Sequence, residues 1–310
     1  MKFTDYATLP AANWSSLKQL EPSTGGSPLW CRWCQDHPRA DTPAFQLGRA
    51  THTAVLEPEE FEGRYVVIDG LLPDGWEDIY QNPAQYAVYP GAVRRGKQWD
   101  HFVVDHGEDP RPIILQSHFD KSMEIGRQME GREPLSRDHY DTAQIIGAAV
   151  KASPSSALLV DGQAEVTVQW TDEKTGLDCK CRPDYLRKDM LIDFKTAKRV
   201  DPRGFDRAAG DYLYHAQLAF YREGCTRAGL LDPGADVVII PAQSQPPYEA
   251  AGPVDLKEQE LAAGDVVWRW CLDRLAACLA ADWWPGASPD RRKMELKPWA
   301  AGVIEEVSDG

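Results

Sequence analysis

In the second half of the chain, apolar and polar residues alternate with a period of two, and this pattern predicts β-strands. The polar run 187–189 interrupts the pattern and predicts a tight turn between two of these strands. Elsewhere, apolar residues recur at the three- and four-residue spacing of amphipathic helices. The predicted strands cover residues 163–171, 178–187, 190–196, 235–242 and 247–251. The predicted helices cover residues 118–131, 136–152, 211–228 and 255–281, with a short helix from Pro154.

The first half of the chain has weaker periodicity but clear helix boundaries. Ser15 and the run 41–43, which ends in a proline, are typical of helix starts, and Pro58 ends the second of these helices. Residues 66–117 are rich in glycine, proline and aromatic residues without a clear period. We therefore expect a short strand and long loops in that region.

The order of these elements predicts one α/β (α+β) domain with a central mixed β-sheet flanked by helices. No stretch has the composition of a linker, so residues 1–310 are expected to form a single domain. Its core is expected over about 118–282, with the N-terminal helical part packed on it. In the last helix, the residues expected to face the core are Val267, Trp270, Cys271, Leu275 and Cys278.

Two acids and a lysine lie within the predicted strands. Asp184 and Asp193 flank the predicted turn, so pairing of the two strands would place their carboxylates side by side. Residues i and i+2 of a strand face the same way, so Asp193 and Lys195 project together while Phe194 points into the core. Neighbouring carboxylates repel each other unless a cation lies between them. This constellation predicts a divalent metal site, with the carbonyl of Phe194 as a further oxygen ligand.

Glu165 supplies a third acid. Residues 165–170 alternate between apolar and polar types, which predicts a strand that starts at this glutamate. The order of the glutamate, a Pro-Asp pair at 183–184 and an Asp-x-Lys run at 193–195 on successive strands resembles the PD-(D/E)XK nuclease superfamily.

The predicted helix after the lysine narrows the resemblance. Tyr214, His215, Gln217 and Tyr221 form a Tyr-His-x-Gln-x-x-x-Tyr pattern, in which the glutamine and the last tyrosine share one helix face. This pattern is similar to the exonuclease VIII (RecE-type) branch and to related RecB-type nucleases. Near the N-terminus, His52 precedes a Leu-Glu-Pro helix stop, which also resembles that branch.

The resemblance implies a Mg²⁺-dependent exodeoxyribonuclease, in which Mn²⁺ can substitute. It implies digestion of linear double-stranded DNA from its ends, 5′ to 3′, in phage-type recombination. It further implies a single-strand annealing protein as a partner and a ring-shaped homo-oligomer. The implied metal ligands are His52, Glu165, Asp184, Asp193 and Phe194, and the implied catalytic residues are Glu165, Asp184, Asp193, Lys195, Gln217 and Tyr221.

Other interpretations stay open at the level of the sequence. A single-strand, flap or endonucleolytic enzyme of DNA repair would use the same constellation, and a non-catalytic DNA-end-binding protein would keep the same fold. Individual residues have structural alternatives as well. His52 is compatible with a hydrogen-bonded core position, and Lys195 with a structural ion pair to Asp184.

The formal net charge of −14 argues against a protein that coats nucleic acid indiscriminately. It is compatible with a nuclease, because metal-binding carboxylates count as acids and a basic channel can be local. The candidate phosphate-contacting residues, which are also compatible with solvated surface positions, are Arg94, Arg95, Lys97, Lys198, Arg199 and Arg203.

Seven cysteines, an odd number, are typical of free thiols in a reducing compartment. The spacing of Cys271 and Cys278 is that of a helix core face, whereas an iron–sulfur cluster requires a different spacing. Cys179 and Cys181 lie on a predicted strand and are expected to face the protein core. The N-terminus lacks the apolar segment of a signal peptide and the apolar run 237–240 is too short to span a bilayer, so we expect a cytoplasmic protein.

Overall fold

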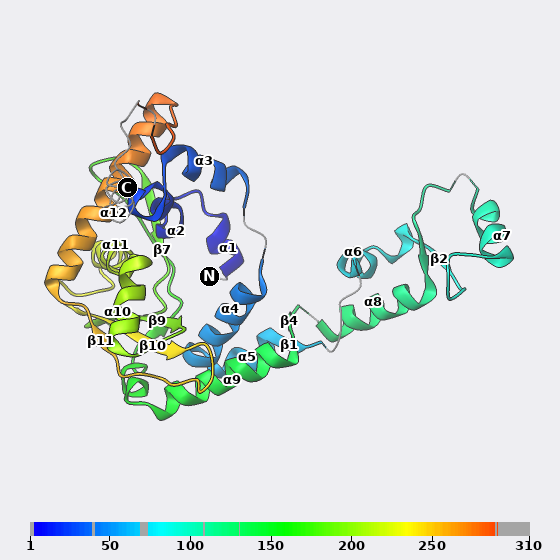
Figure 1. Cartoon of the computed structure of the whole chain (residues 1–310), viewed down its shortest axis with the longest axis horizontal. Helices are drawn as coiled ribbons and strands as arrows, with labels where there is room; N and C mark the ends of the chain where they lie inside the picture. The colour runs from blue at the N-terminus through cyan, green and yellow to red at the C-terminus, as the bar shows by residue number, and fades with distance from the viewer. Residues whose placement is uncertain are drawn as a thin grey trace, which may run out of the picture.

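The central sheet of the protein has five strands in the order β11-β10-β9-β8-β5. β9 and β10 are parallel, whereas the other neighbouring pairs are antiparallel. A mixed sheet flanked by helices confirms the predicted fold class (Figure 1). The five strands are β5 (Gln163–Ala164), β8 (Tyr185–Leu186), β9 (Met190–Ala197), β10 (Asp236–Gln243) and β11 (Val254–Asp255). The structure, a computed structural model, describes residues 3–38, 41–68, 74–107, 109–129, 131–288 and 290.

The hairpin formed by β8 and β9 is the element that the sequence predicts most directly. Tyr185 pairs with Ile192 across it, and the turn lies at 187–189 as expected. Leu191 joins the core on one face of the sheet, whereas Ile192 and Phe194 join the core on the other face. The alternation of β9 is therefore confirmed, with Phe194 fully buried.

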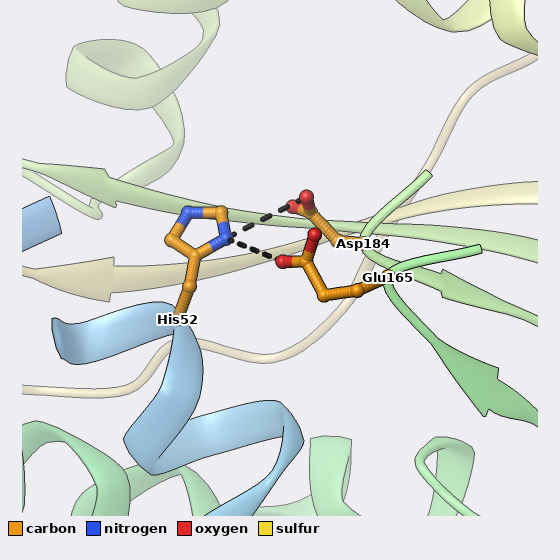
Figure 2. A group of neighbouring side chains, drawn as sticks. All are labelled: His52, Glu165 and Asp184. Atoms are coloured by element: carbon orange, nitrogen blue, oxygen red, sulfur yellow. Dashed lines mark ion pairs between the residues drawn. The ribbon is translucent and has the colours of Figure 1, made fainter. Parts of the chain in front are cut away.

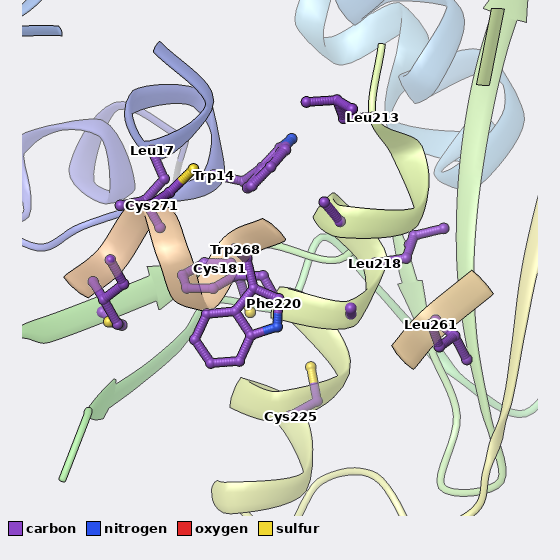
Figure 3. Packing of buried hydrophobic residues seen from close by; sticks show 14 of the residues in the cluster. Trp14, Leu17, Cys181, Leu213, Leu218, Phe220, Cys225, Leu261, Trp268 and Cys271 are labelled. Atoms are coloured by element: carbon purple, nitrogen blue, oxygen red, sulfur yellow. The ribbon is translucent and has the colours of Figure 1, made fainter. Parts of the chain in front are cut away.

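One face of the sheet is covered by α11 (Tyr214–Arg227) and α12 (Glu258–Ala281). The two helices lie close together because Gly264 has no side chain: a Cβ there would lie 2.3 Å from the backbone oxygen of His215. Trp268, and not Trp270, is on the buried stripe of α12, so that part of the prediction is wrong by two positions. Figure 3 shows this core, whose labelled residues are Trp14, Leu17, Cys181, Leu213, Leu218, Phe220, Cys225, Leu261, Trp268 and Cys271.

The other face is covered by α4 (Pro43–Leu56) and α9 (Arg137–Ala152). The hydroxyl of Thr42 caps the N-terminus of α4, and Pro43 occupies its first turn. The two helices cross closely at Gly147, where a Cβ would lie 2.9 Å from the backbone oxygen of Ala54. This crossing holds α4 against the sheet, and α4 carries His52.

An arm extends away from the main body between β1 (Tyr65–Val67) and β4 (Glu133–Leu135), which form a parallel pair (Figure 1). The expectation of long loops over residues 66–117 is therefore wrong in part. Glycine and proline separate short helices there, and Gly126 allows one helix to pack on the ring of Tyr80. The elements of the arm are α6 (Trp76–Gln81), β2 (Ala87–Tyr89), α7 (Lys97–His106), β3 (Ile113–Leu115) and α8 (Gln116–Met129).

Four further boundaries differ from the prediction. The strand expected over 163–171 is two strands: β5, and β6 (Val168–Thr171), which pairs with β7 (Asp178–Cys181) in a separate sheet. The strand expected over 178–187 is likewise two strands, β7 and β8, which belong to different sheets. The strand expected at 247–251 is only an isolated bridge at Ala250. The additional helix α10 (Pro202–Asp211) begins at Asp201, whose side chain accepts a hydrogen bond from the backbone of Gly204.

The remaining helices are short. Within the described part of the chain, no helix combines the length and the apolar character that crossing a membrane requires. The remaining short helices are α1 (Phe3–Thr8), α2 (Trp14–Leu17), α3 (Pro28–Asp36) and α5 (Phe61–Arg64). Short 3-10 helices lie at Lys18–Leu20, Pro22–Thr24, Pro58–Glu60, Pro83–Gln85 and Pro154–Leu158.

Candidate metal centre

The β8–β9 hairpin brings Asp184 and Asp193 to the same end of the sheet. Asp184 directly precedes β8, opposite the stretch of β9 that contains Asp193. Oδ2 of Asp184 accepts a hydrogen bond of 2.8 Å from the backbone N–H of Phe194. This bond crosses from one strand to the next and orients the Asp184 carboxylate, which is almost fully buried.

Glu165 reaches the same place by a local change of backbone direction. It lies just after β5 with a left-handed backbone, φ 54°, and its N–H donates a 2.9 Å hydrogen bond to the backbone oxygen of Asp184. A non-glycine residue seldom adopts this conformation. It separates β5 from β6, so Glu165 is not the first residue of one continuous strand.

His52 comes from a distant part of the sequence, on α4 (Figure 2). Its Nδ1 lies 3.5 Å from Oδ1 of Asp184 and 4.0 Å from Oε1 of Glu165. The imidazole edge packs against the ring of Phe194, with 5.2 Å between the ring centroids. The structure thus brings together a helix histidine and two acids that are 113 or more positions away in the sequence.

The three side chains form a donor set suited to a cation. One ligand atom from each of His52, Glu165 and Asp184 lies within 4.8 Å of the others. Carboxylate oxygens are the preferred ligands of Mg²⁺ and Mn²⁺, and imidazole is a common nitrogen ligand of transition metals. The buried Asp184 and the half-buried Glu165 also need a compensating positive charge. The residues present therefore fit a divalent cation.

Asp193 and Lys195 form the second part of the site. The Lys195 ammonium lies 2.6 Å from Oδ2 of Asp193, so its ion-pair partner is Asp193 and not Asp184. Within the described residues, neither oxygen of the Asp193 carboxylate accepts a hydrogen bond of good geometry, although the side chain is 1% exposed. Burial raises the pKa of Asp193 to about 6, against the attraction of the ammonium. Such a group is a candidate ligand for an added cation.

The pKa values of the other groups reflect the same crowding of acids. Burial, followed by the charge of Asp184, raises the pKa of Glu165. Burial alone would lower the pKa of His52 and raise that of Asp184, but their mutual attraction outweighs burial and reverses both shifts. Burial also opposes the charge on Lys195, yet the two aspartates raise its pKa, so the ammonium stays protonated. The charged groups of the cluster therefore strongly affect one another's pKa values, and burial affects each of these values as well.

The predicted helix residues differ in their relation to this cluster. Burial, followed by the charges of Tyr6 and Asp193, raises the pKa of the Tyr221 phenol, so Tyr221 lies within electrostatic range of the cluster. Tyr214, for which the sequence suggested no role, has its ring 5.2 Å from the Lys195 ammonium. Gln217 is half-buried on the same helix, and within the described residues its side chain forms no hydrogen bond with the acids. Its role stays a prediction, as does that of the Phe194 carbonyl.

Two of the candidate phosphate-contacting residues have partners outside the acid cluster. Arg199 pairs with Asp201, and Arg94 on the arm donates to the backbone oxygen of Ile113. A role of the basic residues in DNA binding stays a prediction. The expectation for the cysteines of β7 and α12 is confirmed, since these thiols are buried in the core: Cys179, Cys181, Cys271 and Cys278.

Residues 29–290 match the family model described as a PDDEXK-like domain of unknown function (DUF3799). The chain belongs to this family. The match covers most of the sequence and includes every residue of the cluster, so the resemblance to the PD-(D/E)XK superfamily is confirmed.

The PDDEXK-like chain is also similar to a crystal structure from Eubacterium rectale that is designated "Putative exonuclease". The two share 14% sequence identity with a TM-score of 0.53, over 99% of this chain and 96% of the other. At this identity the likeness establishes a common fold alone. A search of curated proteins finds no match. The family and the fold support a nuclease, and the details of substrate and reaction are proposals.

Proposed function

We propose that this PDDEXK-like protein is a Mg²⁺-dependent deoxyribonuclease, with Mn²⁺ able to substitute. The observation that carries the proposal is the convergence of His52, Glu165 and Asp184 beside the buried Asp193–Lys195 pair. Three neighbouring carboxylates at a largely buried place repel one another even with Lys195 and Arg182 beside them, so such a cluster is costly without a further cation. A divalent cation would supply positive charge to these acids, and an anionic phosphodiester could then bind to that cation.

The side chains have distinct roles in the proposed reaction. A bound divalent cation neutralises charge on the scissile phosphate and lowers the pKa of a water ligand. His52, Glu165 and Asp184 would hold that cation, because one ligand atom from each lies within 4.8 Å of the others. Asp193 would be a further ligand, because neither of its buried carboxylate oxygens accepts a hydrogen bond of good geometry from the described residues. Lys195, held at 2.6 Å by Asp193, would orient the attacking water and stabilise the additional negative charge of the transition state.

We further propose that the substrate is linear double-stranded DNA, digested from its ends in the 5′ to 3′ direction. The supporting observations are the RecE-type pattern of Tyr214, Gln217 and Tyr221 and the fold shared with a protein designated as an exonuclease. A phage-type recombination role, a single-strand annealing partner and a ring-shaped oligomer belong to the same proposal.

Linear duplex DNA and covalently closed circles of the same sequence test the exonuclease proposal. With Mg²⁺, the wild-type protein should degrade the linear DNA and leave the circles intact, and D184N should degrade neither. Equal digestion of both substrates would contradict the end requirement and favour an endonuclease. Preference for single strands or flaps in a competition assay would favour a repair nuclease. DNA-end binding without hydrolysis under any divalent cation would contradict catalysis altogether.

A further inference from the structure

Arg182 is a buried cation next to the acid cluster that the proposed reaction does not use. Its side chain is 10% exposed, and its Nε donates a 2.6 Å hydrogen bond to Oε2 of Glu165. Its Nη1 donates a second bond, of 3.1 Å, to the hydroxyl of Thr167. The guanidinium is thus attached at two points to the short segment that contains the glutamate.

The two oxygens of Glu165 have different partners. Oε2 faces Arg182 at 2.6 Å, whereas Oε1 faces His52 Nδ1 at 4.0 Å and belongs to the candidate metal centre. A carboxylate held through one oxygen has its other oxygen in a fixed direction. Glu165 has a left-handed backbone and lies outside the regular strands, so the pairing of strands does not fix the direction of its side chain. The bond to Arg182 therefore matters for the direction of its second oxygen.

An aromatic residue of the N-terminal helix lies next to the guanidinium. The centre of the Arg182 guanidinium lies 6.0 Å from the ring of Tyr6, on the N-terminal helix α1. That helix is attached to strand β7 by Lys180, which is almost fully buried and donates to the backbone oxygens of Tyr6, Ala7 and Leu9 at 2.7, 3.2 and 2.7 Å. Lys180 therefore caps the end of α1 and holds Tyr6 behind Arg182.

We propose that Arg182 is a positioning residue that aims Glu165 at the metal, and that the N-terminal helix supports it through Tyr6. This inference rests on the proposed function, since it assigns a role to a contact of the same centre. Groups that hydrogen-bond to metal ligands typically change metal affinity by about 10–100-fold when they are removed. Lysine cannot reproduce the two-point attachment, because its single ammonium lacks the planar fork of arginine.

The test is the affinity of the intact protein for Mn²⁺, measured by isothermal titration calorimetry without DNA. The variants are Arg182→Gln, Arg182→Lys and Glu165→Gln. The matched control is Arg269→Gln, because Arg269 also forms a partly buried ion pair, 2.5 Å from Oδ1 of Asp172, and also stacks on an aromatic ring. It is not part of the acid cluster. Thermal unfolding of the metal-free variants compares their stability.

We expect R182Q to weaken Mn²⁺ binding by about 10–100-fold, R182K to lie between R182Q and the wild type, and R269Q to bind as the wild type does even where its stability falls. Wild-type affinity in R182Q, together with weakened binding in E165Q, would overturn the positioning role and leave the metal centre in place. Wild-type affinity in both variants would overturn the metal centre and the inference together. If R182Q does not fold, R182K decides, and wild-type affinity in that variant overturns the inference.

Discussion

The backbone N–H of Phe194 donates a 2.8 Å hydrogen bond to Oδ2 of Asp184, and this bond links the two strands that carry the acids. It occupies one oxygen of the carboxylate and leaves Oδ1 directed at His52, 3.5 Å away. Asp184 therefore combines two functions, since it is both a strand-to-strand contact and a metal-ligand candidate.

Asp184→Asn separates these two functions. The asparagine oxygen can still accept the hydrogen bond from Phe194, so we expect the protein to fold, whereas the lost charge should weaken Mn²⁺ binding and abolish DNA hydrolysis. Thermal unfolding and calorimetric Mn²⁺ titration of the same preparation measure the two effects. Mn²⁺ binding equal to that of the wild type would contradict the assignment of Asp184 as a ligand.

Lys195→Met should reduce the rate of DNA hydrolysis by about 10²–10³-fold, because it removes an electrostatic group from the transition state. Metal binding should be retained or strengthened, since a positive charge has been removed from beside the acids. Single-turnover kinetics with saturating Mg²⁺ measure the rate, and titration with Mn²⁺ measures the binding. An unchanged rate would show that Lys195 is only the ion-pair partner of Asp193.

Mn²⁺ affinity should fall as the pH is lowered through about 6, which is the pKa of Asp193. Burial raises that pKa above its usual value, so the carboxyl is protonated below about pH 6, and a metal ion must then displace the proton. The raised pKa of Glu165 acts in the same direction. Titrations between pH 5 and 8, at constant ionic strength, measure the effect, and constant affinity across that range would contradict it.

Gly147→Ala tests whether the crossing of α4 and α9 positions His52. The added Cβ would lie 2.9 Å from the backbone oxygen of Ala54, so one helix must shift, at a cost of about 1–3 kcal/mol. We expect a lower midpoint of thermal unfolding and weaker Mn²⁺ binding. The control is Gly210→Ala on α10, where the Cβ meets no atom within 4 Å and stability should not fall. Wild-type stability in G147A would indicate that the helices adjust freely.

The sequence predicts the centre of this fold better than its periphery, for physical reasons. Strand β9 is buried on both faces, so it gives an apolar run, and the polar turn at 187–189 marks where that run begins. The shared face of Asp193 and Lys195 then follows from the two-residue repeat of a strand. The change of direction at Glu165 could not, because a left-handed glutamate has no residue signature of the kind that glycine provides. The arm likewise lacks a long apolar period, since its helices α6 and α7 are short.

The partners of the site were the hardest to predict. His52 could be assigned only through the resemblance, because a lone histidine on a helix does not indicate which strands it faces. Arg182 lies two residues before Asp184, and the period-two rule could have suggested that both face the same pocket. Its contact with Glu165 depends on the backbone at that glutamate, which only the structure shows.

Hydrolysis of DNA by the acid cluster with the help of a divalent cation is best measured on end-labelled linear duplex. Protein stripped with a chelator is incubated with this DNA before and after Mg²⁺ is restored, beside D184N treated identically. We expect release of labelled nucleotides only by the wild-type protein and only when Mg²⁺ is present. Hydrolysis without a divalent cation, equal hydrolysis by D184N, or no hydrolysis with Mg²⁺ or Mn²⁺ would contradict it.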